Sequence, residues 1–388
     1  MKEIAKDVYF VGVDDREIQL FEGMYKVPCG VTYNSYVIKD VNIAVMDSVD
    51  ARFGAEWLAN IERVTQGSAP DYLIVQHMEP DHSACVAAFA KKYPQAKIVG
   101  NVKTLVMLEE YFGEGFPHNR LTVTDGDELT LGKHTLRFVF APMVHWPEVM
   151  FSYDKTNSLL FSADAFGKFG ASDTFEGDWT EEARRYYIGI VGKFGVQVRS
   201  AISKLAGLKI DTVAPLHGPV LSDGRLGEAL QLYSVWSGYQ PETEGTLVAH
   251  ASVYGHTAEA AELLAAELRG RGEKVKVIDL ARDDWAECVA QAFRFSKLVV
   301  AATTYNGGIF PAAREFINRL AERNYKKRTV AFMENGTWAP VCAKLMRAEF
   351  EKCAEISFAQ TQVKIRSALS AESRRAVKEL AEELVTLK

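Results

Sequence analysis

The hydrophobic positions of this chain follow two different patterns, and the change comes near residues 239–245. In the first part, short apolar runs that predict strands cover residues 8–13, 32–38, 43–47, 72–76, 135–141, 149–153, 159–162 and 212–215. Runs with helical spacing lie between them at residues 55–64, 83–93, 102–111 and 181–205. Clustered strands that alternate with helices predict two sheets with helices outside them, an αββα sandwich.

The second part repeats one unit, in which an apolar strand is followed by a helix. The predicted strands are 246–251, 274–279, 298–302, 329–333 and 356–363. The predicted helices are 258–269, 285–293, 311–323, 339–352 and 371–387. This order predicts a doubly wound parallel sheet. Because the polar segment YQPETEG (239–245) separates the two patterns, the predicted domains are 1–243 and 246–388.

Composition narrows the function classes. Hydrophobic residues make up 48% and charged residues 25% of the 388 residues, as in soluble globular proteins. No apolar run approaches the roughly 20 residues of a membrane span, and no signal-peptide pattern opens the chain, so a cytoplasmic protein is expected. None of the five cysteines forms a CxxC pair, which argues against a disulfide framework or a rubredoxin module. The net charge is −6, and the first part of the chain carries the acidic excess, which speaks against nucleic acid as a partner.

Four side chains that can bind metal ions follow the predicted strand 72–76: His77, Glu79, Asp81 and His82. In an extended segment, residues two apart point to the same side, so His77 and Glu79 can converge on one ion. Asp81 and His82 lie beyond a proline, where the chain turns, and can face a second ion. This string predicts a site for two metal ions.

Further candidates follow three other predicted strands: His145, Asp164 and His217. Strand ends are the positions that sheet enzymes use for chemistry. The alternative is a set of loop polar residues with no shared function. The other histidines lack such neighbours and are expected in loops, in packing or at the surface: His118, His134, His250 and His256.

The first strand of the second part leads into a hydroxyl-rich turn, Ser252-Val253-Tyr254-Gly255-His256-Thr257, and then a helix. Free N–H groups at the helix start, two hydroxyls and a glycine turn predict a phosphate cradle. The GxGxxG pattern of dinucleotide folds is absent, and hydroxyls suit a phosphate monoester. A plain helix cap is the alternative for this turn.

Two more loops follow the third and fourth strands of this part: Thr303-Thr304-Tyr305-Asn306-Gly307 and Asn335-Gly336-Thr337-Trp338. Ligands of doubly wound sheets lie beyond the carboxyl ends of the strands, where these loops are. Tyr305 and Trp338 can stack on a planar ring, with core packing or a surface patch as the alternative. The loops resemble those that line the flavin ring in flavodoxins.

The HxExDH string resembles the metallo-β-lactamase superfamily, whose hydrolases usually have HxHxDH at this place. Here Glu79 replaces the second histidine. A site with more carboxylate oxygens suits a harder ion that cycles between +2 and +3. With the downstream ligands and the flavodoxin-like second part, the whole chain resembles the flavodiiron proteins (A-type flavoproteins).

This resemblance implies an oxidoreductase that reduces dioxygen to water and/or nitric oxide to nitrous oxide, with FMN and two non-haem irons. It implies one iron on His77, Glu79 and His145, a second on Asp81, His82 and His217, and Asp164 as the bridge. In some members water replaces the histidine that matches His82. Tyr25 is expected to donate a hydrogen bond to a bound diatomic, and Trp146 to form a wall of the substrate cavity. Packing accounts for both residues equally well.

The resemblance also implies a head-to-tail homodimer, or a dimer of such dimers, in which FMN of one protomer serves the irons of the other. The expected electron donor is a separate rubredoxin, a flavin reductase, NADH or a reduced deazaflavin. A metal-dependent hydrolase fused to a flavodoxin-like electron carrier is the alternative reading, and a non-enzymatic sensor of oxygen or nitric oxide is a third. The sequence does not rank the two gases.

Overall fold

The computed structural model describes residues 2–176 and 178–387, which fall into two compact units, Met1–Ser234 and Val235–Lys388. The division lies inside helix α7 (Asp223–Ser237), and the polar segment 239–245 belongs to the second unit. None of the described helices combines the length and the apolar character needed to cross a membrane.

The first unit contains two sheets that face each other. One sheet has the order β1 (Glu3–Ala5), β2 (Val8–Phe10), β7 (Tyr36–Ile38), β8 (Ala44–Met46), β9 (Tyr72–Ile74), β10 (Lys97–Gly100), β11 (Arg120–Thr122). The other has the order β12 (Glu128–Thr130), β13 (Thr135–Phe140), β14 (Met150–Asp154), β15 (Leu159–Phe161), β16 (Thr212–Ala214), β17 (Leu221–Ser222). Fully buried side chains from both sheets, such as Ile38, Met46, Phe138 and Phe161, form the core between them.

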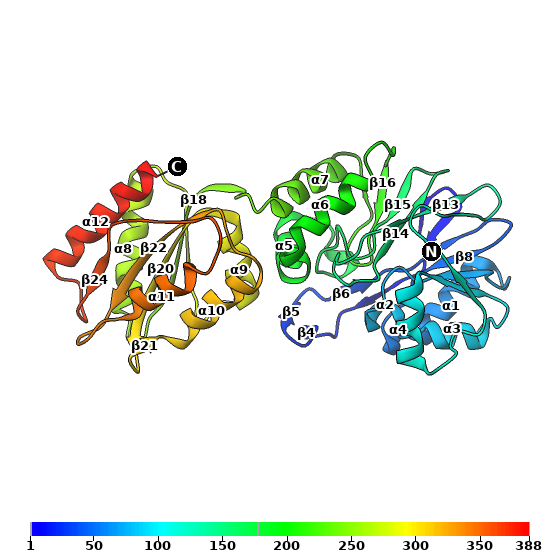
Figure 1. The fold of residues 1–388 in the computed structure, drawn as a ribbon, viewed down its shortest axis with the longest axis horizontal. Coiled ribbons are helices and arrows are strands. Elements are labelled where there is room, and N and C mark those ends of the chain that lie inside the picture. Colours follow the sequence, from blue (N-terminus) through cyan, green and yellow to red (C-terminus); the bar gives the residue numbers. More distant parts are fainter. Residues whose placement is uncertain (1, 177, 388) are drawn as a thin grey trace. The chain divides into compact units, whose positions relative to one another are not determined.

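Helices cover the outer faces of both sheets (Figure 1). On one side lie α1 (Gly54–Thr65), α2 (Pro80–Ser83), α3 (Val86–Lys92) and α4 (Val102–Phe112), and on the other α5 (Thr180–Tyr186), α6 (Gly195–Lys204) and α7. Two small ladders complete the unit: β3 (Val13–Asp15) with β6 (Val31–Tyr33), and β4 (Leu20–Phe21) with β5 (Tyr25–Lys26). The expected αββα sandwich is confirmed.

The expectation of one helix over 181–205 is wrong. After α5 the chain forms a π turn (Tyr187–Val191) and a 3-10 turn (Gly192–Phe194) before α6 begins. Three glycines interrupt the segment, and a side chain at Gly189 would meet the Tyr25 ring at 2.8 Å. Glycine weakens the interior of a helix, and at Gly189 it also allows the backbone to approach the Tyr25 ring. The regular helix is therefore interrupted here.

The second unit contains the expected parallel sheet, in the order β19 (Val275–Asp279), β18 (Thr243–Ala251), β20 (Phe295–Tyr305), β22 (Arg328–Asn335), β23 (Ile356–Phe358). This is the flavodoxin-like order 2-1-3-4-5. The single strand expected over 356–363 is wrong, because β23 ends at Phe358 and a separate strand, β24 (Val363–Ile365), pairs with the outer half of β22. A short strand, β21 (Gly308–Ile309), folds back on β20.

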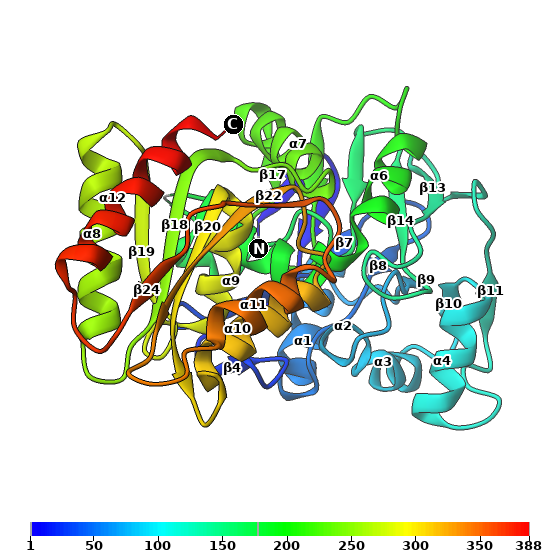
Figure 2. The same cartoon turned by 60° about the vertical axis from the view of Figure 1, so that its left-hand side comes forward.

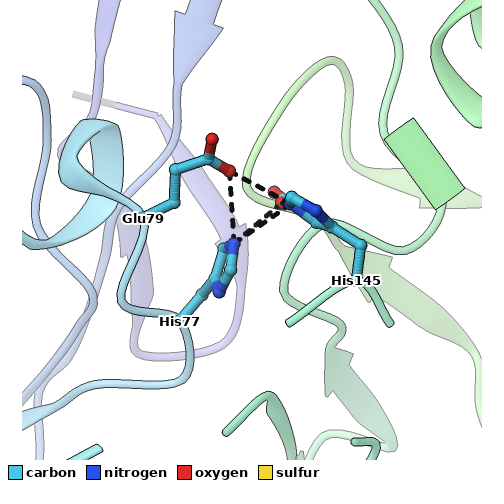
Figure 3. Close-up of side chains that lie close together, drawn as sticks. His77, Glu79 and His145 are labelled. Carbon is cyan, nitrogen blue, oxygen red and sulfur yellow. Dashed lines mark hydrogen bonds and ion pairs between the residues drawn. The ribbon is translucent and has the colours of Figure 1, made fainter. Parts of the chain in front are cut away.

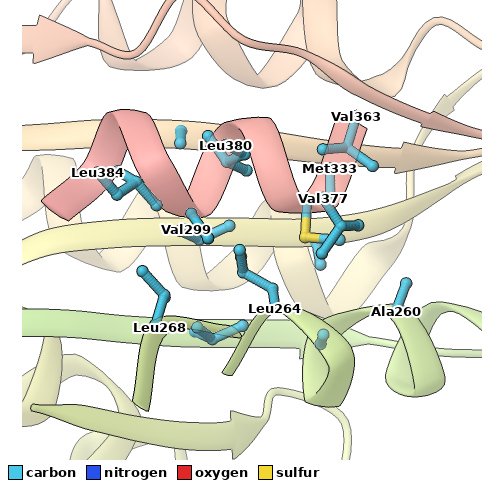
Figure 4. Close-up of a cluster of buried hydrophobic side chains, with 14 of the residues drawn as sticks. Ala260, Leu264, Leu268, Val299, Met333, Val363, Val377, Leu380 and Leu384 are labelled. Atoms are coloured by element: carbon cyan, nitrogen blue, oxygen red, sulfur yellow. The ribbon is translucent and has the colours of Figure 1, made fainter. Parts of the chain in front are cut away.

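Two helices, α8 (His256–Gly270) and α12 (Ala371–Thr386), lie on one face of this sheet, and α9 (Trp285–Arg294), α10 (Pro311–Glu322) and α11 (Cys342–Phe350) lie on the other (Figure 2). Leu264 and Leu268 from α8 meet Leu380 and Leu384 from α12 at helical spacing, and all four are fully buried (Figure 4). Each such burial stabilises the fold by about 1.5–3 kcal/mol. This packing holds the carboxyl ends of β18, β20 and β22 together at one edge.

Candidate metal centre and flavin pocket

Three side chains from two different segments form the first metal-binding group. His77 and Glu79 follow β9, and His145 follows β13 (Figure 3). Glu79 Oε2 lies 3.0 Å from His145 Nε2 and 3.4 Å from His77 Nε2. The two imidazole nitrogens are 3.3 Å apart. The extended chain after β9 therefore does bring residues 77 and 79 to the same side.

A second group lies beside the first. His82 Nε2 and His217 Nε2 are 2.9 Å apart, and each lies 3.3 Å from Asp81 Oδ2. Asp81 and His82 belong to α2, the short helix that begins at Pro80, and His217 follows β16. Both histidines are almost completely buried.

Asp164 joins the two groups, and it divides its two carboxylate oxygens between them. Oδ2 lies 3.0 Å from His145 Nε2 and 3.2 Å from His77 Nε2. Oδ1 lies 3.4 Å from His82 Nε2 and 3.6 Å from His217 Nε2. This is the geometry of a carboxylate that bridges two cations, which it can hold close together while offsetting their repulsion.

The distances within each group fit an ion at its centre. Metal–ligand bonds of about 2.0–2.2 Å place neighbouring ligand atoms about 3.0–3.5 Å apart, as found here. Among the described residues, Asp81 Oδ1 has no hydrogen-bond partner, and Asp81 Oδ2 and Asp164 Oδ1 face only the imidazole nitrogens of His82 and His217, at 3.3–3.6 Å. Buried oxygens without partners are costly unless a cation binds them. Four imidazoles and three carboxylates suit an iron pair better than zinc alone.

Outer hydrogen bonds fix the orientation of two ligand rings. Glu148 Oε1 accepts a hydrogen bond from His77 Nδ1 at 2.8 Å and another from the Met78 N–H at 2.8 Å. The Thr32 carbonyl accepts from His217 Nδ1 at 2.6 Å. Because the Nδ1 atoms are used in this way, both rings present Nε2 to the metal position. Glu148 is not among the residues predicted from the sequence, although it lies three residues after His145.

The charges of the groups are strongly coupled. Burial alone would lower the pKa of His145, but its hydrogen bonds to Asp164 and Glu79 outweigh burial and raise the pKa to about 9. Burial would raise the pKa of Asp164, but the charge of His77 and hydrogen bonds from the imidazoles hold this pKa well below its usual range. Without metal, protons on the imidazoles therefore supply the positive charge that pairs with the carboxylates. Metal ions must displace these protons in order to bind.

Aromatic residues surround the metal groups. The Tyr25 hydroxyl donates to the Gly189 carbonyl at 2.9 Å, so a bound diatomic would have to compete for this proton. Tyr186, which the sequence analysis missed, packs its ring 5.6 Å from the His217 ring, and its buried hydroxyl has no hydrogen-bond partner among the described residues. Trp146 stands edge-on to His77, with ring centroids 5.3 Å apart.

A cavity of about 480 Å³ lies at the carboxyl edge of the parallel sheet in the second unit. Its lining includes every residue predicted for the cofactor except Gly255, whose φ of 97° shapes the turn into α8. The lining also includes Ala339 and Ser367, which were not predicted. Ser367 follows β24, the strand whose separate existence the sequence pattern did not show.

Side-chain hydrogen bonds tie the three loops of this cavity together. Thr257 Oγ1 lies 3.1 Å from Thr303 Oγ1 and accepts a hydrogen bond from Asn335 Nδ2 at 3.3 Å. Asn335 and Ser367 exchange two hydrogen bonds of 3.0 Å. The Gly255 N–H donates to Ser252 Oγ at 3.1 Å. The N-terminal N–H groups of α8 then face the cavity with no intrahelical partners, as a phosphate requires.

Aromatic side chains stand at the rim of the cavity. Tyr254 is 92% exposed, Trp338 is 82% exposed and Tyr305 is 47% exposed. A cavity of this size, with a phosphate cradle at one end and aromatic faces at the other, fits FMN. Large aromatic side chains this exposed in one place usually mark a surface that another molecule covers.

Comparisons with known proteins agree with the two domain types of this chain. Residues 31–218 match the family model described as ODP family beta lactamase, and residues 247–371 match a flavodoxin domain. The chain is 30% identical over 320 residues to the uncharacterized protein MJ0732 of Methanocaldococcus jannaschii, covering 81% of this chain and 80% of that protein. It is 28% identical to the nitric oxide reductase of Moorella thermoacetica, covering 88% of each chain.

Among solved structures, the rubredoxin oxygen:oxidoreductase of the anaerobe Desulfovibrio gigas has the same fold, with a TM-score of 0.92. The match covers 99% of this chain and 97% of that chain at 24% sequence identity. The two domain matches, in this order on one chain, agree with the flavodoxin-like and metallo-β-lactamase-like architectures seen here. The chain belongs to the flavodiiron protein family.

Proposed function

We propose that this protein reduces dioxygen to water, nitric oxide to nitrous oxide, or both, at a diiron centre that FMN supplies with electrons. The cofactors of the family, FMN and a non-haem iron pair, fit the two sites described above. The relatives named nitric oxide reductase and rubredoxin oxygen:oxidoreductase support a gas reductase. We also propose a cytoplasmic location, which the five free cysteines favour because reducing compartments keep thiols reduced.

The observation that carries this proposal is the position of Asp164 between the two groups. A hydrolase can work with one metal ion, but a reaction that needs several electrons at one place benefits from two redox ions held together. Oδ2 faces His145 and Oδ1 faces His82. Glu79, which replaces the histidine of the hydrolases, adds a further anionic oxygen and favours iron.

The residues of the chain have separable tasks in this reaction. When bound, FMN and the two irons supply the electrons that gas reduction requires. Asp164 holds the two metal positions side by side, and Glu148 keeps the His77 ring in its ligating orientation. Thr257 and Asn335 hold the loops that line the flavin cavity. Burial of the ligand atoms keeps bulk water from the metal positions.

We further propose that the chain acts as a head-to-tail homodimer, alone or as a dimer of dimers. The exposed Tyr254 and Trp338 beside the flavin cavity support a covered surface there. In the first unit, the β4–β5 hairpin next to the metal groups exposes Leu20 and Met24, at 46% and 42%. Rubredoxin, a flavin reductase, NADH and a reduced deazaflavin are the proposed electron donors.

The test is to measure iron and FMN per chain and then the consumption of each gas by the fully reduced protein. We expect two irons and one FMN per protomer and catalytic loss of at least one gas, with water or nitrous oxide as product. A protein that contains zinc, lacks flavin and hydrolyses a thioester or lactam would instead support the hydrolase alternative. Binding of gas without turnover would support the sensor.

A further inference from the structure

A carboxylate that the proposed function does not use is buried next to the flavin cavity. Glu334 is the penultimate residue of β22, and only 3% of it is exposed. The residues that follow it, 335–339, all line the cavity. Acidic side chains are almost never buried this fully unless they have a partner, so the surroundings of Glu334 show what its charge does.

Two neighbours stabilise the negative charge of this carboxylate. Oε2 accepts a hydrogen bond from the Ala343 N–H, in the first turn of α11, at 3.1 Å. Oε1 lies 3.7 Å from Nζ of Lys364, which pairs with Glu334 across β22 and β24. A helix N-terminus and an ammonium group both favour an anion. Because the Lys364 side chain is 62% exposed, solvent weakens its contribution, and much of the Glu334 charge is not neutralised.

Short contacts connect this charge to the cavity wall. Thr304 lines the cavity, and its Oγ1 accepts hydrogen bonds from the N–H groups of Val341 and Cys342 at 3.0 and 3.1 Å. Cys342 directly precedes Ala343, which donates to Glu334, and the Cys342 Sγ lies 4.0 Å from Glu334 Oε2. Cys342 is fully buried, so little water screens the Glu334 charge on the side of the cavity.

The effect of this charge on a flavin depends on the oxidation state of the ring. Two-electron reduction with uptake of one proton converts FMN into FMNH⁻, so the ring gains one negative charge. A poorly screened carboxylate repels this added charge and interacts much less with the neutral oxidised ring. The carboxylate therefore weakens the binding of reduced FMN more than that of oxidised FMN. By thermodynamic linkage, this difference lowers the reduction potential of the bound flavin.

We propose that Glu334 lowers the reduction potential of FMN in this protein and that Lys364 offsets part of this effect. The inference rests on the proposed function, in which FMN supplies electrons to the metal centre, because a lower potential increases the driving force of that transfer. The alternative is that Glu334 only caps α11. Glutamine keeps an oxygen that can accept the Ala343 N–H, so a role limited to capping predicts an unchanged potential in Glu334→Gln.

Spectroelectrochemical titration of the holoenzyme, followed by flavin absorbance at pH 8, measures this potential. Glu334→Gln should raise the affinity for reduced FMN relative to oxidised FMN about 3- to 10-fold. This ratio corresponds to a potential higher by about 14–30 mV for a two-electron couple. Lys364→Met should lower the potential, since it removes the offsetting charge. Glu351→Gln, which changes an exposed carboxylate at the C-terminal end of α11, should match the wild type.

An unchanged or lower flavin potential in Glu334→Gln would overturn the proposal. Lys364→Met changes the same electrostatic field without touching the acceptor of the Ala343 N–H, so it also decides if Glu334→Gln does not fold. An unchanged or higher potential in Lys364→Met would overturn the proposal as well. A wild-type protein that binds no FMN would refute the proposed function together with this inference, whereas a fully loaded protein that reduces neither gas would refute the function alone.

Discussion

Replacing Glu148 with glutamine changes the charge beside one metal ligand and almost nothing else. Glu148 Oε1 accepts hydrogen bonds from His77 Nδ1 and from the Met78 N–H, both at 2.8 Å. The other oxygen, Oε2, has no hydrogen-bond partner among the described residues, so the glutamine NH2 can take its place. The variant therefore keeps one oxygen that accepts both hydrogen bonds, and it loses the negative charge.

The size of the effect follows from these two hydrogen bonds. The bond to Met78 exists with and without metal, so it cancels in the binding free energy. The bond to His77 changes from charge-assisted to neutral, which costs about 1.5 kcal/mol or more. Outer-sphere partners of ligating histidines are worth about 10–100-fold in metal affinity, or about 1.4–2.7 kcal/mol. We therefore expect iron to bind the His77 group about tenfold to a hundredfold more weakly in Glu148→Gln.

The loss should grow as pH rises. Burial opposes protonation of His77, but the charge of Asp164 and the hydrogen bonds that His77 donates to Asp164 and Glu148 outweigh burial and raise the His77 pKa well above its usual value. Removing the Glu148 charge lowers this pKa, so proton competition falls and offsets part of the loss at neutral pH. This offset shrinks as rising pH removes the proton from the His77 imidazole, so the loss of iron affinity should be larger at pH 9 than at pH 7.

Chelator competition measures this prediction directly. Iron affinity is followed at pH 7 and pH 9 in the wild type, in Glu148→Gln and in Glu109→Gln, a surface carboxyl that pairs with Arg120. Glu109→Gln should match the wild type, and FMN content should be equal in all three. Equal iron affinity of Glu148→Gln and the wild type at both pH values would refute the reasoning.

Four other changes have defined outcomes. Asp164→Ala should abolish gas reduction and the spectroscopic signature of paired irons while FMN stays bound; normal activity would show that the bridge assignment is wrong. Thr257→Ala should weaken FMN binding about 2- to 10-fold by fluorescence titration, with iron unchanged, since it removes hydroxyl contacts in the cradle; unaltered FMN affinity would contradict the cradle. The free energy of unfolding of the metal-free protein should fall between about pH 6.5 and 9 in denaturant titrations. In this range His145, whose folded pKa is about 9, loses its proton and with it the ion pairs to two carboxylates. His145→Gln should make the free energy of unfolding depend less on pH in this range. Tyr186→Phe should not lower the free energy of unfolding, because the hydroxyl is buried without a partner among the described residues; clear destabilisation would mean that a partner exists.

Much of the fold could be predicted because the hydrophobic periods are strong. In the second part, the alternation of strands and helices predicted a parallel sheet. The structure has such a sheet, in which β18 lies between β19 and β20. The segment 181–205 could not be predicted correctly, because its π turn follows from the approach of the Tyr25 ring to Gly189, which is 164 residues away in the sequence. Helix α7 was missed because Gly224 and Gly227 weaken its helical pattern.

Some residues of the candidate sites could be predicted from the sequence, and others could not. Residues that follow strands, such as His77, Asp164 and Thr257, were accessible to sequence reasoning because strand ends meet at one sheet edge. Glu148 and Tyr186 were not, since their importance depends on which atom of a ligand they face in the folded chain. Ser367 was missed because a short irregular segment separates β23 from β24, so its loop did not show as a strand end.

The central claim is that seven side chains from distant parts of the chain hold two irons as a bridged pair. Mössbauer spectroscopy of protein loaded with two ⁵⁷Fe per protomer, recorded in the fully oxidised state at low temperature and in an applied field, tests this claim most directly. We predict a diamagnetic ground state from two antiferromagnetically coupled ferric ions. Magnetically split spectra from two isolated high-spin ferric ions would contradict it.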